Sequence, residues 1–129
     1  MNWRCFVSAC VLAVMPAITF AGNPLGTWHT EPDLKKQTAH VQVTKCGSGY
    51  CGTMVRVYDK SGKQISHKNI GKRLFWDARP TGKGDYTGRA YVPVFNKDFP
   101  ATMTVSGSRL VVKGCNGPIC KSQRWTLVR

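Results

Sequence analysis

The sequence predicts an all-β domain, a single antiparallel up-and-down arrangement of about eight short strands. Three observations support this. Thirteen glycines and seven prolines interrupt short runs in which apolar and polar residues alternate. No amphipathic run is long enough for a helix. Two pairs of cysteines, each pair separated by four residues, bracket turn-forming residues between strand-like runs. Such alternation with frequent turn residues is typical of antiparallel sheets.

The clearest hairpin signal lies in residues 39–58, AHVQVTKCGSGYCGTMVRVY. Alternating runs flank a glycine-rich turn at 47–49, with a cysteine on each side. On the returning strand we expect Thr53, Val55 and Val57 to share one face, because side chains two apart point the same way.

The other strands are expected at residues 25–30, 73–77, 86–92, 101–105, 109–113 and 123–128, with a brief strand at 64–66. The polar segment 59–72 is expected to form a long loop, and 79–85 a turn. A meander of this length closes into a barrel or folds into a sandwich. We expect the barrel, because closure removes exposed strand edges. An eight-stranded barrel has an interior just wide enough for its own side chains or one small ligand.

Residues 1–21 are expected to be a cleaved signal peptide. A single positive charge, Arg4, precedes a long apolar run that ends in small residues at Ala21. The alternative is a transmembrane anchor, because the uncharged run is long enough to span a bilayer. Pro16 and the lack of a cationic stop-transfer cluster favour cleavage. The domain is then 22–129, located outside the cytoplasm, with no membrane span left after cleavage.

Four cysteines remain after cleavage, and an oxidising compartment favours disulfides. Three pairings are open. We expect Cys46–Cys51 and Cys115–Cys120, because each pair brackets a glycine-containing turn. Each disulfide closes a short loop and so restricts the unfolded chain, which stabilises the folded protein by about 2 kcal/mol in the loop-entropy model. A zinc site made by all four cysteines is the alternative, and we disfavour it because the spacing is at the edge of the usual range.

The formal net charge is +13, which favours anionic partners outside the cytoplasm. The simplest interpretation of this charge is a well-solvated surface. Attachment to an anionic envelope component through the densest cationic cluster is the alternative, and we disfavour nucleic acid because the cluster has few aromatic residues. The cluster comprises Lys60, Lys63, Lys68, Lys72, Arg73, Arg79 and Lys83.

The sequence contains no catalytic constellation, so we expect neither an enzyme nor a cofactor. His29, His40 and His67 lack the spacing of metal ligands, and we read each as an exposed or hydrogen-bonded imidazole. There is no nucleophile elbow and no glycine-rich phosphate loop before a helix. The acidic residues mostly occupy turn positions, which argues against a pair of catalytic carboxylates.

Aromatic residues are the other candidates for a ligand site. The simpler interpretation is that they fill the interior of the barrel. Adjacent Phe75 and Trp76 must face opposite sides of a strand, so one is core and the other outward. The candidates for ligand binding are Trp28, Trp76, Tyr91 and Trp125.

Several short motifs, in order along the chain, resemble the DUF2147 family of small exported bacterial proteins of uncharacterised function. They are Gly26-Thr27-Trp28, Val41-x-Val43-x-x-Cys46-Gly47…Cys51-Gly52, Gly88-x-x-Tyr91-x-Pro93 and Leu110-x-Val112-x-Gly114-Cys115…Cys120…Trp125-Thr126.

This resemblance implies a lipocalin-like eight-stranded barrel with a small-molecule cavity. Together with the expected signal peptide, it implies a protein that is located in the bacterial periplasm or secreted. Lipocalins also carry a Gly-x-Trp on the first strand, capped by an arginine of the last. Trp28 with Arg124 or Arg129 corresponds to that pair.

Together these features predict an exported, non-enzymatic protein that holds a small or apolar ligand in its barrel. The alternative is a basic envelope-surface protein with a filled barrel that attaches to anionic glycolipid or polysaccharide. A ligand-sized interior void favours the first, and a packed interior with a one-sided basic patch favours the second. We disfavour inhibition of a lysozyme, since lysozymes are usually basic too. We expect a monomer and leave a dimer open.

Overall fold

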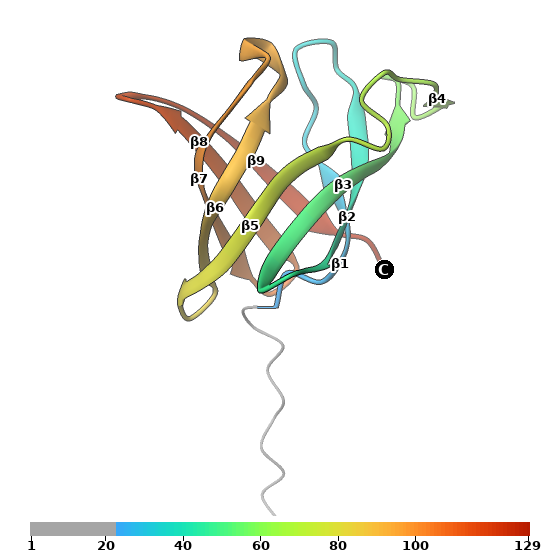
Figure 1. The fold of residues 1–129 in the computed structure, drawn as a ribbon. Coiled ribbons are helices and arrows are strands. Elements are labelled where there is room, and N and C mark those ends of the chain that lie inside the picture. The colour runs from blue at the N-terminus through green and yellow to red at the C-terminus, as the bar shows by residue number, and fades with distance from the viewer. Residues whose placement is uncertain (1–22) are drawn as a thin grey trace, which may run out of the picture.

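The computed structural model describes residues 23–129 as one antiparallel sheet that closes on itself (Figure 1). The expected signal peptide, residues 1–21, lies outside the described residues. The strands are β1 (Gly26–Thr30), β2 (Thr38–Cys46), β3 (Gly49–Tyr58), β4 (Gln64–Ile65), β5 (Arg73–Gly82), β6 (Asp85–Val92), β7 (Lys97–Ser106), β8 (Arg109–Asn116) and β9 (Ile119–Leu127). A short 3-10 helix, η1 (Pro93–Phe95), precedes β7.

Closure comes from pairing between the first and last strands. Eight strands follow one another around the barrel, β1 also pairs with β9, and the two-residue β4 lies outside the ring on β3. At the closing seam, Trp28 lies opposite Leu127 and Thr30 lies opposite Trp125. The prediction of an up-and-down barrel of about eight strands is therefore confirmed.

Because neighbouring strands alternate in direction, the connections gather at two ends of the barrel. We call one the termini end, with tight turns at 47–48, 83–84 and 107–108 and the start of β1 and the finish of β9. We call the other the loop end, uppermost in Figure 1. Its connections are 31–37, 59–72, 93–96 and 117–118.

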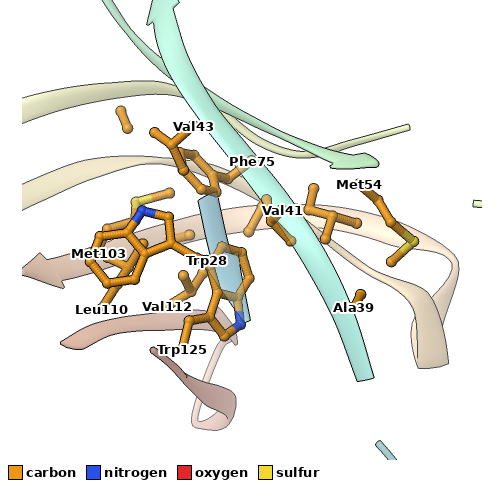
Figure 2. Packing of buried hydrophobic residues seen from close by; sticks show 14 of the residues in the cluster. Trp28, Ala39, Val41, Val43, Met54, Phe75, Met103, Leu110, Val112 and Trp125 are labelled. Carbon is orange, nitrogen blue, oxygen red and sulfur yellow. The ribbon is translucent and has the colours of Figure 1, made fainter. Parts of the chain in front are cut away.

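Large side chains occupy the interior, as Figure 2 shows. Trp28 and Phe75 are each 1% exposed, and Leu110 is fully buried. The Trp28 indole Nε1 donates a hydrogen bond of 2.8 Å to the carbonyl oxygen of Pro24, so its polar atom is satisfied inside the protein. The ring centroids of Phe75 and Trp125 are 6.0 Å apart. The interior is a packed aromatic and aliphatic core.

A bulge overturns the expected alternation on β3. His40 of β2 lies opposite Arg56, but the next residue, Val41, lies opposite Met54, so Val55 is the extra residue. One extra residue reverses the facing of all that follow. Met54 and Val57 are therefore both buried, and the expectation that Thr53, Val55 and Val57 share a face is wrong.

Several strands run further than expected, β5 and β7 among them. β5 continues through Pro80 to Gly82, which narrows the predicted turn at 79–85 to two residues. Its register shifts between Trp76 and Arg79, where Asp77 has a φ of 52°. β7 begins at Lys97, four residues before the expected start. Proline and the bulge hid these strands from a reading based on alternation.

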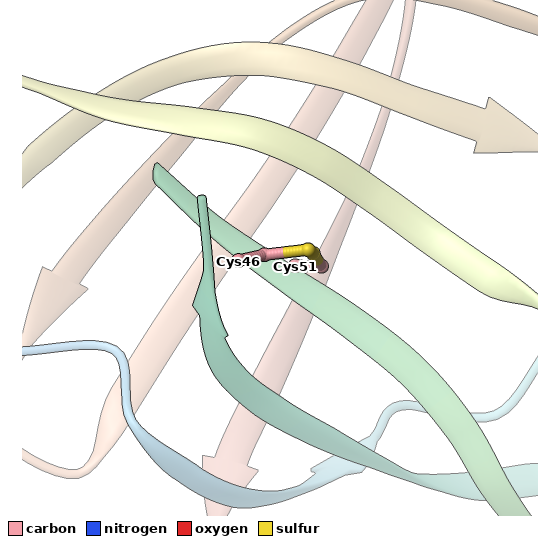
Figure 3. The surroundings of a disulfide bond; sticks show 2 residues. All are labelled: Cys46 and Cys51. Carbon is pink, nitrogen blue, oxygen red and sulfur yellow. A yellow bond between two sulfur atoms is a disulfide. The ribbon is translucent and has the colours of Figure 1, made fainter. Parts of the chain in front are cut away.

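The structure contains both local disulfides. Cys46–Cys51 joins β2 to β3 beside the turn at 47–48 (Figure 3), and Cys51 is 2% exposed. Cys115–Cys120 joins directly opposite residues of β8 and β9 near the loop end. Both bonds tie hairpins whose strands are already paired, so they reinforce local register rather than link distant parts of the barrel.

Candidate functional site

A hollow on the outer wall of the barrel, beside the loop end, is the candidate site. It has a volume of about 690 Å³ and is open to solvent. We call it the ring groove. Its lining residues are His29, Pro32, Lys36, Thr38, His40, Tyr58, Asp59, Lys60 and Gly62. A second hollow of about 320 Å³ lies on the β6–β7–β8 wall.

Strand alternation places the floor of the ring groove on the outside. Trp28 and Thr30 of β1 point into the core, so His29 between them points out. His29 lies directly opposite His40 of β2, and His40 lies opposite Arg56 of β3. Tyr58 is two residues beyond Arg56 on the same outer face. Three neighbouring strands therefore present one row of polar rings and a guanidinium.

The three rings of the floor touch one another. The centroids of His29 and His40 are 5.2 Å apart and those of His40 and Tyr58 are 4.9 Å apart, both in edge-to-face geometry. His29 and Tyr58 are 6.3 Å apart. Ring pairs at these distances and angles attract one another, which fixes the side chains before any ligand arrives.

His40 is the centre of this cluster. Its Nδ1 accepts a hydrogen bond of 3.4 Å from the Nε of Arg56, and the Tyr58 hydroxyl lies 3.5 Å from the same atom. Partial burial, followed by the nearby His29 and Arg56, lowers the pKa of His40 from its ordinary value of 6.5. At neutral pH the imidazole is therefore uncharged, with its other nitrogen, Nε2, carrying the proton.

We expect the stability of the protein to fall as the pH drops below about 6.5. The unfolded chain takes up a proton on His40 near its ordinary pKa of 6.5, whereas the folded protein does so only at lower pH. More protons bound to the unfolded state mean that acidification favours unfolding. Denaturation midpoints measured between pH 5 and pH 8 should show this slope.

The matched variants are His40→Gln and His67→Gln. The first should flatten the slope, and the second, in the β4–β5 connection, should leave the contribution of His40 in place. An unchanged slope in His40→Gln would contradict the lowered pKa.

Charged residues flank the rings on both sides. Lys36, in the β1–β2 connection, lies on one side, and Asp59 and Lys60, at the end of β3, lie on the other. The Ser61 hydroxyl, followed by the Lys63 backbone N–H, lowers the pKa of Asp59 and holds it as a carboxylate. That carboxylate accepts both hydrogen bonds on Oδ1, so its role is to shape the turn.

The four aromatic candidates fall into two groups. Trp28 and Trp125 are in the core, at 1% and 3% exposure. Trp76 and Tyr91 are half-buried, and Phe75 takes the core position beside Trp76. The Lys72 Nζ lies 3.9 Å above the Tyr91 ring, whose hydroxyl donates a 2.7 Å hydrogen bond to Asn96.

The arginine cap suggested for Trp28 is not seen. Arg124 and Arg129 are both exposed, and no guanidinium stacks on the indole within residues 23–129. Arg124 instead donates its backbone N–H to Glu31 Oε1 at 2.9 Å. The Trp28 indole is held by the Pro24 carbonyl described above.

The cationic cluster is continuous in the sequence but divided in space. Lys60, Lys63, Lys68 and Lys72 belong to the loop end. Lys83 lies at the termini end, separated from Arg73 by β5, a strand of ten residues that is roughly 30 Å long. Arg79 lies along β5 between the two ends.

Reasoning from the sequence missed the histidine pair that forms the floor. His29 and His40 are 11 residues apart with a loop between them, and their contact depends on the β1–β2 register. Each histidine alternates with buried residues on its strand, and this pattern could have indicated that both point outward. The register that sets one opposite the other could not be derived from alternation alone.

Three further findings bear on the chemistry. Within residues 23–129, no group of three or more histidine, cysteine or acidic side chains is placed to hold a metal ion. The same residues contain no helix with the length and apolar character needed to cross a membrane. Every buried side-chain nitrogen or oxygen among them has a hydrogen-bond partner.

A closed eight-stranded up-and-down barrel with a packed core and an open groove on its wall defines a small lipocalin-like barrel protein. Residues 26–127 match the family described as an uncharacterized protein conserved in bacteria, DUF2147. The chain belongs to this family, which confirms the resemblance of its motifs.

A solved structure supports the fold. A protein from the human pathogen Helicobacter pylori, described as belonging to the lipocalin family, superimposes with a TM-score of 0.63 and 16% sequence identity. The match covers 81% of this chain and 82% of the other. At that identity the similarity establishes the lipocalin-like fold alone. No curated protein matches the sequence.

Proposed function

We propose that this protein is an exported, non-enzymatic binding protein of the bacterial periplasm or exterior. Its ligand is a small anion with a flat apolar face, and the ring groove is its site. The observation that carries the proposal is the contact among His29, His40 and Tyr58, flanked by Lys36 and Lys60. Binding sites typically combine an apolar or aromatic surface with a few polar groups that orient the ligand.

The groove supports this ligand class for two physical reasons. The imidazole and phenol rings are packed against one another, so a flat ligand meets a surface that loses little conformational freedom on binding. Lys36, Lys60 and Arg56 lie around the rings and attract a carboxylate or a phosphate. Two sources share this chemistry, the acidic sugars and the aromatic acids.

The packed core favours the wall over the interior as the binding surface. Trp28, Phe75 and Leu110 occupy the centre of the barrel with at most 1% exposure. A ligand inside would have to displace them, at a cost of several kcal/mol of core packing. We therefore propose that the protein binds its ligand in the ring groove and not, as the sequence alone suggested, in the interior of the barrel.

Calorimetric titration with D-glucuronate and benzoate tests the proposal and separates the two sources. Their neutral counterparts, glucose and benzyl alcohol, measure the contribution of charge. We expect one of the two anions to bind more tightly than its neutral counterpart. Tyr58→Ala and Lys60→Gln should each weaken that binding by about tenfold, equivalent to about 1.4 kcal/mol.

Two control variants lie away from the groove. Trp76→Ala removes an outward ring on β5, and Lys83→Gln removes a cation at the termini end. Both should bind as the unmodified protein does. Equal weakening by controls and groove variants, or binding of neither anion, would reject the ring groove as an anion site.

A further inference from the structure

The exposed apolar side chains of this protein are concentrated at one end. Among the described residues, seven large hydrophobic side chains are substantially exposed, and five of them lie in or beside the connections of the loop end. They are Leu34 at 92%, Ile70 at 40%, Val94 at 60%, Phe95 at 40% and Ile119 at 59% exposure. The other two, Leu25 and Val128, are next to the ends of β1 and β9 at the termini end.

Each of the four connections at the loop end contributes to this set. Leu34 lies in the β1–β2 connection, Ile70 in the β4–β5 connection, and Ile119 at the start of β9 after the β8–β9 turn. Val94 and Phe95 form η1 between β6 and β7. The connections surround the rim of the barrel (Figure 1), so the apolar side chains are distributed around the rim rather than gathered in one patch.

Lysines accompany each apolar side chain. Lys35 follows Leu34, Lys68 and Lys72 flank Ile70, Lys97 follows η1, and Lys121 follows Ile119, all of them exposed. The four acidic side chains at this end all accept hydrogen bonds from the protein, and one of them, Glu31, accepts the Arg124 backbone N–H. Asp33 accepts the backbone N–H groups of Lys35 and Gln37, Asp59 accepts those of Ser61 and Lys63, and Asp98 pairs with Arg89 at 2.6 Å.

We propose that the loop end docks on an anionic lipid bilayer, with Leu34, Ile70, Val94, Phe95 and Ile119 entering the headgroup region. Lysines near an anionic leaflet each contribute about 1 kcal/mol of attraction, equivalent to roughly fivefold in affinity. Their long apolar stems let the ammonium groups stay at the headgroups while neighbouring apolar side chains go deeper.

The pattern fits a bilayer better than a protein partner. The core of a protein interface is a continuous patch, depleted in lysine. The loop end has the opposite arrangement, with separate apolar residues on four connections and lysine beside each. A flat fluid surface can accept all four connections together. This inference is independent of the ring groove, because the side chains proposed to enter the membrane do not line that groove.

Flotation with vesicles tests the proposal. We expect the protein to float with vesicles of equal parts phosphatidylcholine and phosphatidylglycerol, and to remain in solution with phosphatidylcholine alone. High salt should weaken the binding, since ions screen the lysines. Binding that is equal on both vesicles, or absent from both, would overturn the proposal.

Two sets of variants locate the contact. Leu34→Ser with Val94→Ser and Ile119→Ser alters three exposed loop-end positions, and should reduce vesicle binding by more than about tenfold, as expected for lost insertion. The matched control, Leu25→Ser with Val128→Ser, alters the termini end and should bind as before. A circular dichroism spectrum identical to that of the unmodified protein verifies the fold in each. If both sets bind like the unmodified protein, or lose binding equally, the loop end is not the docking surface.

Insertion itself has a separate readout. A tryptophan introduced as Leu34→Trp should shift its fluorescence to shorter wavelength on anionic vesicles, and brominated lipid should quench it. Leu25→Trp, at the termini end, should do neither. Floating vesicles without a shift in Leu34→Trp would contradict insertion and reject the proposal.

Discussion

Trp28→Ala should destabilise the protein by about 3–5 kcal/mol, the range for removing a large aromatic side chain from a packed core. Trp28 is 1% exposed and lies on β1, the strand that closes the barrel against β9. Its indole N–H donates a hydrogen bond to the Pro24 carbonyl oxygen. Its removal leaves a cavity at the seam and an unpaired carbonyl oxygen. In a domain of this size the melting temperature should fall by more than about 12 °C.

Trp76→Ala is the matched control, because it removes the same side chain from an outward, half-buried position on β5. Trp76→Ala should lower the free energy of unfolding by well under half as much as Trp28→Ala does. Denaturant unfolding with the disulfides intact measures both variants. A loss below about 1.5 kcal/mol in Trp28→Ala would show that the site tolerates a cavity, which a packed interior does not.

Gly88→Ala should destabilise the protein by about 3 kcal/mol, the upper part of the range for overpacking. A Cβ at Gly88 would lie 2.5 Å from the carbonyl oxygen of Trp76 and 2.9 Å from the backbone nitrogen of Ala78. These are backbone atoms of the β5 bulge, where the register shifts, so no side-chain rotation relieves the clash. The β5–β6 pairing itself has to move.

Gly82→Ala provides the comparison within the same pair of strands. The closest atom to a Cβ there is the Asp85 Oδ2 at 3.6 Å, an ordinary contact. The substitution should be neutral or slightly stabilising, since alanine restricts the unfolded chain more than glycine does. Thermal unfolding of the two variants side by side checks the contrast. Equal stabilities would mean that the bulge is more adaptable than the geometry indicates.

Most of the barrel could be predicted because its pattern is local. Alternation in residues 39–58 and the cysteine-flanked turn located the β2–β3 hairpin, in which Ala39, Val41 and Val43 form the buried face of β2. The errors came from features that break a period of two. The bulge at Val55 reversed the facing on β3, and Pro80 made the second half of β5 look like a turn.

The ring groove was much harder to predict. His29, His40 and Tyr58 lie on three strands, and their contact requires both the strand order and the register. A sequence gives the face of each residue but not its partner across the strand. The cationic cluster shows the opposite limit of a sequence pattern. It was continuous in the sequence, but β5 carries Lys83 to the far end of the barrel from Lys60.

The central claim is that binding takes place on the wall of the barrel and not inside it. Nuclear magnetic resonance of the protein titrated with whichever of glucuronate and benzoate binds tests it most directly. We predict that the ring signals of His29, His40 and Tyr58 shift with saturation, while the indole N–H signals of Trp28 and Trp125 stay in place. Shifts of the two buried indoles, with the groove rings unchanged, would contradict the claim and return the site to the interior.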